Sequence, residues 1–378
     1  MTNDKYQLVQ LTDLKDIESC HTINFVEWAN GLSRDQYLIR EKGVKLKLSQ
    51  DDMNLTYWAL QEKQETGEWK LVSAFESVSR PALYKKKGQP VDKTVSHSIG
   101  SVFTAKEHRG KGYAREMMAR GLEKLTHHDD EHLNKEQRKE AVVALWSDIK
   151  DYYAQFGYKK EDTHEIKIKL TSQTSGVVSH SWPTQVRPIR NPEEIVELAK
   201  RAEKQLIEDM EKRTEEDGIT RVAIAPRPAV FAHTHWRSQY VGPILTKGPE
   251  KGVPEVFGAH CGKTSVLWTQ DYGSNKIYLL RTITDRDASA EQVTSDLNLI
   301  LQAALNEAQK WGLEYICLWT QDVPEVTSLE KVHEAFVASQ IPSVDAIIHD
   351  RPDSWPMYCV PNDPDRVDWI SNGKYAWF

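Results

Sequence analysis

Apolar and polar residues in the first half of the chain recur with helical spacing in some segments and alternate as in strands in others. Two short helices are predicted at "LTDLKDIESCHTIN" and "LSRDQYLIREKG", and three strands at "NLTYWALQEK", "EWKLVSAFESV" and "SHSIGSVFTA". A longer helix is predicted from Tyr113, with an apolar stripe made by Ala114, Met117, Met118, Gly121, Leu122 and Leu125. The strand "AVVALWSD", the short helix "KDYYAQFGY" and the strand "HEIKIKL" follow. This order predicts an α/β domain at residues 1–171.

A change of composition separates this segment from the second half. Residues 172–187 are rich in Ser, Thr and Gly and predict a linker. Beyond the linker, Asn191 and Pro192 predict the start of a long helix. Strands are predicted at "RVAIA", "VFGAHC", "TSVLWTQDY", "KIYLLRTIT", "EYICLWTQD", "AIIHD" and "PMYCV". Residues 188–378 are therefore expected to form a second domain of the α+β class.

The two halves repeat one order of elements. A strand, a long amphipathic helix, a strand ending in Leu-Trp and a short helix occur at 97–157 and again at 276–339. The order indicates either a duplicated or a convergent α/β unit.

The turn at "EHRGKGYA" has two glycines between a predicted strand and a predicted helix. The first amides of a helix have no partner within the helix, and with the helix dipole they bind anions, phosphate above all. Gly110 and Gly112 permit turn conformations and close approach of a ligand, and Arg109 and Lys111 add positive charge. The spacing matches neither G-x-x-x-x-G-K-[ST] nor G-x-G-x-x-G. A phosphate-bearing ligand is expected here, although a glycine turn without a ligand is the alternative.

The spacing R-x-x-G-x-A from Arg109 to Ala114 resembles the acetyl-coenzyme A signature of the GCN5-related N-acetyltransferases (GNAT). The resemblance covers about 165 residues and implies a mixed sheet that splays at its centre. It implies that amides of the signature hold the pyrophosphate of acetyl-coenzyme A, and that the preceding strand pairs with the pantetheine arm. The cofactor residues implied in this way are Val102, Phe103, Thr104, Arg109, Gly110, Lys111, Gly112, Tyr113 and Ala114. Lys106, where the family often has proline, and Ser147-Asp148, where asparagine is common, depart from the pattern.

Tyr153 in "YYAQFGY" matches a second family segment, Y-x-x-x-G-[FY]. The resemblance implies that its hydroxyl protonates the departing coenzyme A thiolate, which a buried site cannot release as an anion at low cost. The attacking amine must also lose a proton. Glu76 and His97 are the candidate bases, and for each an ordinary structural role is the alternative.

Over nearly its whole length the sequence also resembles the fungal lysine N-acetyltransferases, which acetylate the side-chain amine of free lysine in lysine catabolism. The match rests on "YLIRE", "TYWAL", "ESVSRPA", "SVFTAKEHRGKGYAREMM", "WTQDY" and "NGKYAWF". It implies transfer of acetyl to the N6 amine of free L-lysine. Arg80 is a candidate partner for the α-carboxylate. Asp271, Asp322 and the aromatic ending "KYAWF" are candidates for the acceptor pocket. A protein or histone acetyltransferase and a non-catalytic coenzyme A-binding scaffold are the alternatives.

The second half is not expected to bind coenzyme A. Its strand-to-helix turn, "TITDRDASAEQV", has no glycine, and Asp285 and Asp287 would repel a pyrophosphate. The expected role is to cover the acceptor site, because a free amino acid needs enclosure and paired charges for specificity. Its fold is expected to be a degenerate GNAT-like unit, with an NTF2-like cone as the alternative.

The composition of the chain limits the classes of binding partner that are expected. The 378 residues carry a net charge of −7, which argues against a nucleic-acid partner. No run of 18 apolar residues occurs, so no membrane segment is expected. A cytoplasmic location is expected instead. The four cysteines form no C-x-x-C pair. The histidines at 127–132 lie in a charged run that is expected to be a solvated loop. A strand at 233–235 would place both histidine rings on one face, but no third ligand is evident, so no metal is expected. The sequence leaves the oligomeric state open.

Overall fold

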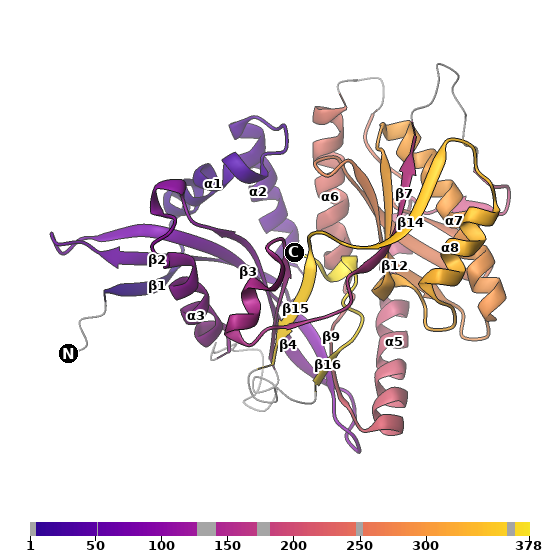
Figure 1. The fold of residues 1–378 in the computed structure, drawn as a ribbon, viewed down its shortest axis with the longest axis horizontal. Coiled ribbons are helices and arrows are strands. Elements are labelled where there is room, and N and C mark those ends of the chain that lie inside the picture. Colours follow the sequence, from indigo (N-terminus) through magenta and orange to yellow (C-terminus); the bar gives the residue numbers. More distant parts are fainter. Residues whose placement is uncertain (1–4, 51, 127–140, 172–181, 247–251, 361–366) are drawn as a thin grey trace.

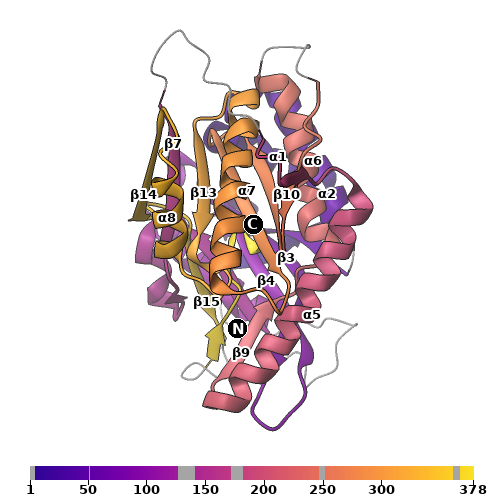
Figure 2. The ribbon, with the colours of Figure 1, turned by 90° about the vertical axis from the view of Figure 1, so that its right-hand side faces the viewer.

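The structure of the protein is a computed structural model, and it describes residues 5–50, 52–126, 141–171, 182–246, 252–360 and 367–378. Two mixed sheets lie side by side, each with its own helices, and the chain passes between them several times (Figure 1). Figure 2 shows α7 and α8 on the outer face of the second sheet.

The first sheet has the strand order β1-β2-β3-β4-β5-β15-β6. In addition, β9 (Thr220–Ile224) pairs with the end of β3, and β16 pairs with β9. Most of its elements come from the first part of the chain: β1 (Tyr6–Leu11), α1 (Leu14–Trp28), α2 (Arg34–Leu48), β2 (Asn54–Lys63), β3 (Trp69–Lys85), β4 (Asp92–Phe103), η1 (Lys106–His108), α3 (Tyr113–Thr126), β5 (Val142–Ser147), η2 (Lys150–Phe156) and β6 (Lys159–Lys160). The predicted helices and strands of this part are confirmed.

The second sheet has the order β14-β7-β13-β12-β11-β10-β8. Its elements are β7 (His164–Leu170), β8 (Val186–Pro188), α5 (Pro192–Asp217), α6 (Pro228–Leu245), β10 (Gly258–Cys261), β11 (Thr264–Asp271), β12 (Lys276–Thr284), α7 (Ala290–Trp311), β13 (Tyr315–Trp319), η4 (Thr320–Asp322), α8 (Leu329–Ala338) and β14 (Val344–Asp350). The tail of the chain adds β15 (Trp355–Cys359), β16 (Val367–Trp369) and η5 (Lys374–Ala376).

The two units repeat one topology and exchange a strand. Between β5 and β6 of the first sheet lies β15, which comes from the end of the chain. The corresponding place in the second sheet, between β13 and β14, is taken by β7, which follows β6 in the sequence. The strand "HEIKIKL" is therefore where it was predicted, but it pairs in the other unit. Alternation of apolar and polar residues predicts that a segment is a strand, but it does not predict which strand the segment pairs with.

The ends of the helices follow local rules. Asp13, Ser33, Asn191 and Ser289 each accept a backbone N–H in the first turn of the helix that follows. Pro192 occupies the first position of α5, and Gly218, with φ +77°, ends it. One buried cluster spans both units and includes Val78, Ile224, Leu280, Trp369 and Tyr375. The two sheets therefore share a core.

Several sequence predictions need correction. The segment containing His233 and His235 is the helix α6, not a strand, so the two rings do not share a strand face. The NTF2-like alternative for the second half is wrong, because that half has the same strand order as the first. The strands "RVAIA" (β9) and "PMYCV" (β15) are confirmed, but they belong to the first sheet. The linker at 172–187 and the histidines at 127–132 lie wholly or largely outside the described residues.

In the described part of the chain, no helix combines the length and the apolar character needed to cross a bilayer.

Candidate active site

Strands β4 and β5 diverge at the centre of the first sheet. Their parallel pairing runs from Ser96 and Val142 to Ile99 and Leu145 and then stops, although β4 continues to Phe103. At this point β4 has a bulge, where Ser101 adopts a φ of +51°. The edge of β4 from Gly100 onward is thus left without a partner strand on the β5 side. This gap can accept an extended ligand arm that pairs with the β4 backbone.

The glycine turn between β4 and α3 is open. Gly110 and Gly112 have φ values of +78° and +81°, and a Cβ at either position would meet no atom within 4 Å. Gly112 stands directly before α3 and has no side chain to cap the first amides of that helix. The turn therefore offers free N–H groups and space at a helix N-terminus, as an anion site requires.

The side chains of this turn differ in their burial and in their hydrogen bonds. The Arg109 guanidinium donates to the Thr104 carbonyl and to Glu27, both at 3.0 Å. The Tyr113 hydroxyl donates to Glu62 at 2.7 Å and its ring is buried, so only the backbone of Tyr113 is available to a ligand. Lys111 is exposed and Ala114 is half-buried.

Tyr153 lies on η2, and its side chain is buried against Tyr152 and Tyr158, with ring centroids 5.2 and 6.0 Å away. Burial, followed by the charges of Tyr152 and Asp148, raises the pKa of Tyr153 above its usual range. Its phenol therefore keeps its proton at neutral pH, as a group that is to donate a proton must.

The two candidate bases lie on opposite faces of the sheet. Glu76 pairs with Gly100 across β3 and β4, at the start of the gap, and faces α1. Its carboxylate is bonded to His21 Nε2 at 3.2 Å and to the Ser101 hydroxyl at 2.9 Å. His97 lies on the same face of β4 as Ile99, two residues further on, and is in register with Val143 of β5. The side chains of Ile99 and Val143 belong to the core beneath α3. Glu76 therefore lies on the face of the sheet toward α1, and His97 on the face toward α3.

A pocket lies between the two units. It is lined by the α1–α2 connection, by α6, by the end of β11 and by the tail, with Asn30, Arg40, Arg237, Asp271, Lys374 and Trp377 among the lining residues. Trp377 lines the pocket, and its neighbour Phe378 lies over the gap: a Cβ at Gly100 would be 2.9 Å from the Phe378 ring. The pocket and the gap are thus adjacent along the tail.

The pocket is lined by charged side chains of both signs. Burial acts to raise the pKa of Asp271, but Arg237 and Lys374, with hydrogen bonds from Ser274, hold it below its usual value. Burial lowers the pKa of Lys374 to about 7, and its Nζ lies 3.7 Å from the Trp377 ring centroid and 4.2 Å from that of Tyr278. Among the described residues, no hydrogen-bond acceptor contacts the Arg237 guanidinium. The pocket therefore holds an anion and a cation with free bonding capacity.

The other predicted substrate residues lie elsewhere. Arg80 is fully buried and donates to Ser98 at 2.5 Å and to the carbonyl of Ala376. Asp322 accepts the Lys374 amide at 2.9 Å. Both therefore hold the tail. Sequence reasoning missed Arg237. Lys374 stands in the ending "KYAWF", which was expected to contribute to the pocket for its aromatic residues.

The strand order, the central gap and the open glycine turn define this protein as an N-acetyltransferase of the GNAT class. A family model, the LYC1 GNAT-like C-terminal domain, matches residues 168–378. Because this is more than half of the chain, the protein belongs to the LYC1-like GNAT family.

Two curated proteins are similar over nearly the full length. A lysine acetyltransferase of Yarrowia lipolytica is 26% identical, over 98% of this chain and 99% of that protein. The uncharacterized protein YGR111W of Saccharomyces cerevisiae is 22% identical, over 95% of this chain and 94% of that protein.

Solved structures are more distant. A GCN5-related N-acetyltransferase from Kribbella flavida has a TM-score of 0.49 and 11% identity, over 95% of this chain and 72% of that one. The N-myristoyltransferase of Saccharomyces cerevisiae with bound myristoyl-CoA has a TM-score of 0.48 and 10% identity, over 95% of this chain and 84% of that one.

Proposed function

We propose that the protein transfers the acetyl group of acetyl-coenzyme A to the N6 side-chain amine of free L-lysine, as a cytoplasmic enzyme of lysine breakdown. The observation that carries the proposal is the pocket between the units, with Asp271 and Arg237 beside the gap in the first sheet. The 26% identical lysine acetyltransferase of Yarrowia lipolytica supports lysine as the acceptor.

Acetyl-coenzyme A supplies the acetyl group as a thioester. The open turn at Gly110 and Gly112 fits a diphosphate, which the free amides before and within the first turn of α3 would bind. Val102 to Thr104 lie on and just beyond the unpaired part of β4 and would pair with the pantetheine arm through the main chain. No role for a metal is needed in this assignment.

The pocket suits the common end of a free amino acid. Asp271 would bind the α-ammonium group, and the planar fork of Arg237 would bind the α-carboxylate in bidentate form. Trp377 and Phe378 link the pocket to Gly100, and consecutive Cα atoms are only about 3.8 Å apart. An extended lysine side chain can therefore lead from the pocket to the thioester.

The chemical step needs one base and one acid. Glu76 would accept a proton from the lysine ammonium group, and the free amine would attack the thioester carbonyl and form a C–N bond. Collapse of the tetrahedral intermediate breaks the C–S bond, and Tyr153 would give its proton to the sulfur. The nitrogen of the intermediate gives up its second proton, which restores the Tyr153 hydroxyl. The amide and the thiol of coenzyme A leave neutral.

Competition between acceptors tests the proposal. L-lysine, L-ornithine, cadaverine, Nα-acetyl-L-lysine and a histone-tail peptide are assayed with acetyl-coenzyme A, and mass spectrometry locates the acetyl group. Lysine should be acetylated on N6 and should exceed all the others, because each analogue shortens the reach or leaves a buried pocket charge unpaired.

Variants sharpen the same test. Asp271→Asn should raise the KM for lysine by about 10-fold or more, since a charge-assisted hydrogen bond contributes about 1.5–3 kcal/mol. The control Glu65→Gln, in an exposed hairpin, should leave the KM unchanged. Preferential acetylation of the peptide would overturn the proposal in favour of a protein acetyltransferase, and no turnover of any amine would favour a coenzyme A-binding scaffold.

A further inference from the structure

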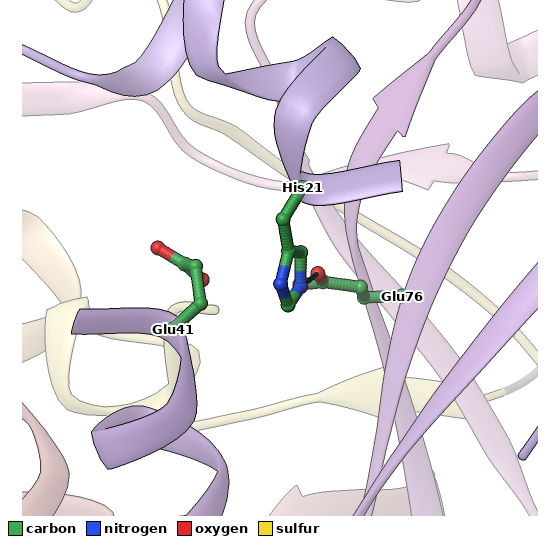
Figure 3. A group of neighbouring side chains, drawn as sticks. All are labelled: His21, Glu41 and Glu76. Atoms are coloured by element: carbon green, nitrogen blue, oxygen red, sulfur yellow. Dashed lines mark hydrogen bonds and ion pairs between the residues drawn. The ribbon is translucent and has the colours of Figure 1, made fainter. Parts of the chain in front are cut away.

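A buried imidazole lies between two carboxylates next to the proposed base. His21 of α1 has its Nε2 3.2 Å from Glu76 Oε1. Glu41 of α2 lies on the other side of the ring, within 4.8 Å and without a direct hydrogen bond to it. One nitrogen of His21 and one oxygen of each glutamate all lie within 4.8 Å of one another. Figure 3 shows the ring between the two carboxyl groups. Three separate elements, α1, α2 and β3, thus bring this group together.

Each member of the group is held by a further contact. Ser101, in its left-handed conformation on β4, donates to the second oxygen of Glu76 at 2.9 Å. Arg40 donates to Glu41 at 2.7 Å, and the Tyr57 ring packs edge-on against His21 with centroids 5.2 Å apart. The backbone strain at Ser101 fits a functional site, where such conformations concentrate.

The proposed reaction leaves a proton at a place without direct access to water. The exposed fraction of Glu76 is 6% and that of His21 is 3%, whereas the side chain of Glu41 is 12% exposed. Other acidic groups nearby do not take the proton. Burial raises the pKa of Tyr57 above its usual range and that of Cys20 to about 12, so both already carry their protons.

We infer that His21 and Glu41 form a relay that carries the substrate proton from Glu76 to solvent. Glu76 gives the proton taken from the ammonium group to Nε2 of His21, and Nδ1 of His21 releases its own proton to Glu41. Glu41 then passes one proton to water, and a half-turn of the His21 ring brings its proton-free nitrogen back to Glu76. Each turnover thus moves one proton and consumes no other reactant. This inference rests on the proposed function for the identity of Glu76 as the base.

The test separates proton transfer from support of Glu76. His21→Gln keeps an amide N–H that can donate to Glu76 but cannot pass a proton on. A relay predicts that kcat with lysine falls by about 10²-fold, while the KM for lysine and the Kd for acetyl-coenzyme A stay within about twofold. Glu41→Gln should lower kcat in the same direction. His21→Ala should recover turnover when imidazole is added.

A matched control is available in the same chain. His235 is also buried, but its Nε2 meets the carbonyl of Trp268 at 3.0 Å and no carboxylate. His235→Gln should leave kcat unchanged at a temperature at which the variant stays folded by circular dichroism.

The outcomes distinguish the two proposals. Wild-type protein that acetylates another amine but not lysine overturns the lysine assignment, and the same variants are then measured with that amine. A wild-type kcat in His21→Gln, or no response of His21→Ala to imidazole, overturns the relay alone. A stoichiometric metal in the purified protein whose removal by EDTA abolishes turnover would also overturn it, because the three residues would then be ligands.

Discussion

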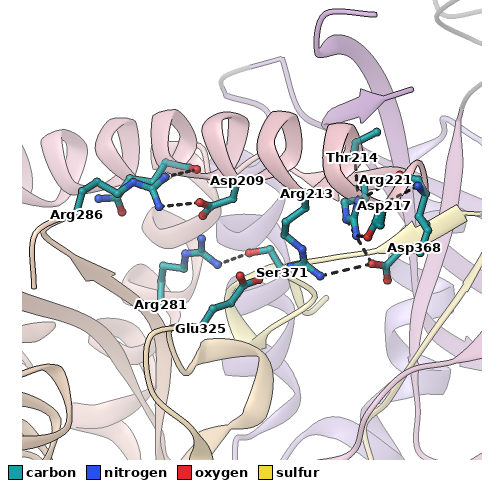
Figure 4. A network of polar contacts seen from close by, with 12 residues as sticks. Asp209, Arg213, Thr214, Asp217, Arg221, Arg281, Arg286, Glu325, Asp368 and Ser371 are labelled. Atoms are coloured by element: carbon teal, nitrogen blue, oxygen red, sulfur yellow. Dashed lines mark hydrogen bonds and ion pairs between the residues drawn. The ribbon is translucent and has the colours of Figure 1, made fainter. Parts of the chain in front are cut away.

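The two GNAT units of this chain have the same strand order and use the same turn in opposite ways. In the first unit, Gly112 precedes α3 and leaves its amides and the adjacent space open. In the second, Ser289 caps α7 by accepting the Gln292 amide at 3.2 Å, and Asp287 pairs with Lys263 at 2.6 Å. Arg286 of the same turn is held by Asp209 at 2.6 Å (Figure 4). A side chain that caps the helix removes the anion site that the fold otherwise provides.

The central gaps of the two sheets also differ. Pairing between β12 and β13 ends at Tyr278 and Cys317, so the second sheet diverges as the first does. Here, however, the tail fills the gap: Arg281 contacts Ser371 (Figure 4), and Lys374 lies over Tyr278. The second unit thus uses its gap to anchor the segment that lines the acceptor pocket of the first. One fold gap can hold a ligand or the protein's own chain, depending on which side chains enter it.

The largest expected effect comes from closing the open turn. Gly112→Val places a branched side chain at a φ of +81°, in the space where the diphosphate would approach. Loss of about two charge-assisted bonds at 1.5–3 kcal/mol each would weaken acetyl-coenzyme A binding by roughly 10³-fold. Calorimetric titration measures the Kd for acetyl-coenzyme A.

Two controls belong to this experiment. Gly67→Val carries the same backbone strain in an open hairpin, with φ +88°, and Ser289→Gly uncaps α7 in the second unit. Both should leave the affinity unchanged. An undiminished affinity of Gly112→Val would remove the turn from the cofactor site.

A smaller effect is expected from the acid. Tyr153→Phe removes the hydroxyl and keeps the ring packing on Tyr152 and Tyr158. We expect kcat to fall about 10²-fold, the usual scale for a positioned acid, with the affinity for acetyl-coenzyme A retained. Steady-state kinetics and calorimetry give the two quantities, with Tyr152→Phe as the neighbouring control. An unaltered kcat would assign Tyr153 to packing alone.

The smallest effect concerns the anchored tail of the second unit. Burial raises the pKa of Asp322 from 3.8 to about 7, so between these values the folded state binds a proton that the unfolded chain has lost. Its contribution to stability is therefore present below pH 3.8 and is lost as the pH rises through about 7. Asp322→Asn removes this dependence.

Urea unfolding at pH 4.5 and 6.5 measures the dependence of the free energy of unfolding on pH. The fall in the free energy of unfolding between the two values should be smaller in Asp322→Asn than in the wild type by about 2 kcal/mol. Glu65→Gln, an exposed hairpin carboxylate, serves as control. Equal slopes in wild type and Asp322→Asn would show that the carboxyl group is not buried as described.

The sequence predicted the elements of both units and the open turn because these depend on local spacing. Apolar periodicity defined α3 and α7, and the two glycines defined the turn between β4 and α3. Strand partners were not predicted for β7 and β15, because each strand has an apolar pattern that suits either sheet. A strand's partner depends on long-range packing that one sequence does not display.

The residues that line the pocket between the units were predicted in part. Asp271 lies where a pocket residue was expected, because it ends a strand at the edge between the units. Arg80 instead donates to the carbonyl of Ala376, a contact across 296 residues that no local pattern could reveal. Arg237 was missed because α6 was not recognised as a helix, and so its faces could not be assigned.

The exchanged strand sets an order of events during synthesis on the ribosome. β5, which is the inner neighbour of the catalytic gap, has to wait for β15, which is made more than 200 residues later, from Ser147 to Trp355. At about 5–20 residues per second the delay is on the order of 10–40 s. During that time an apolar strand edge of the nascent chain is exposed, a state that favours binding by chaperones and association with other chains. The acetyltransferase unit can therefore complete its sheet only after nearly all of the second unit has been translated.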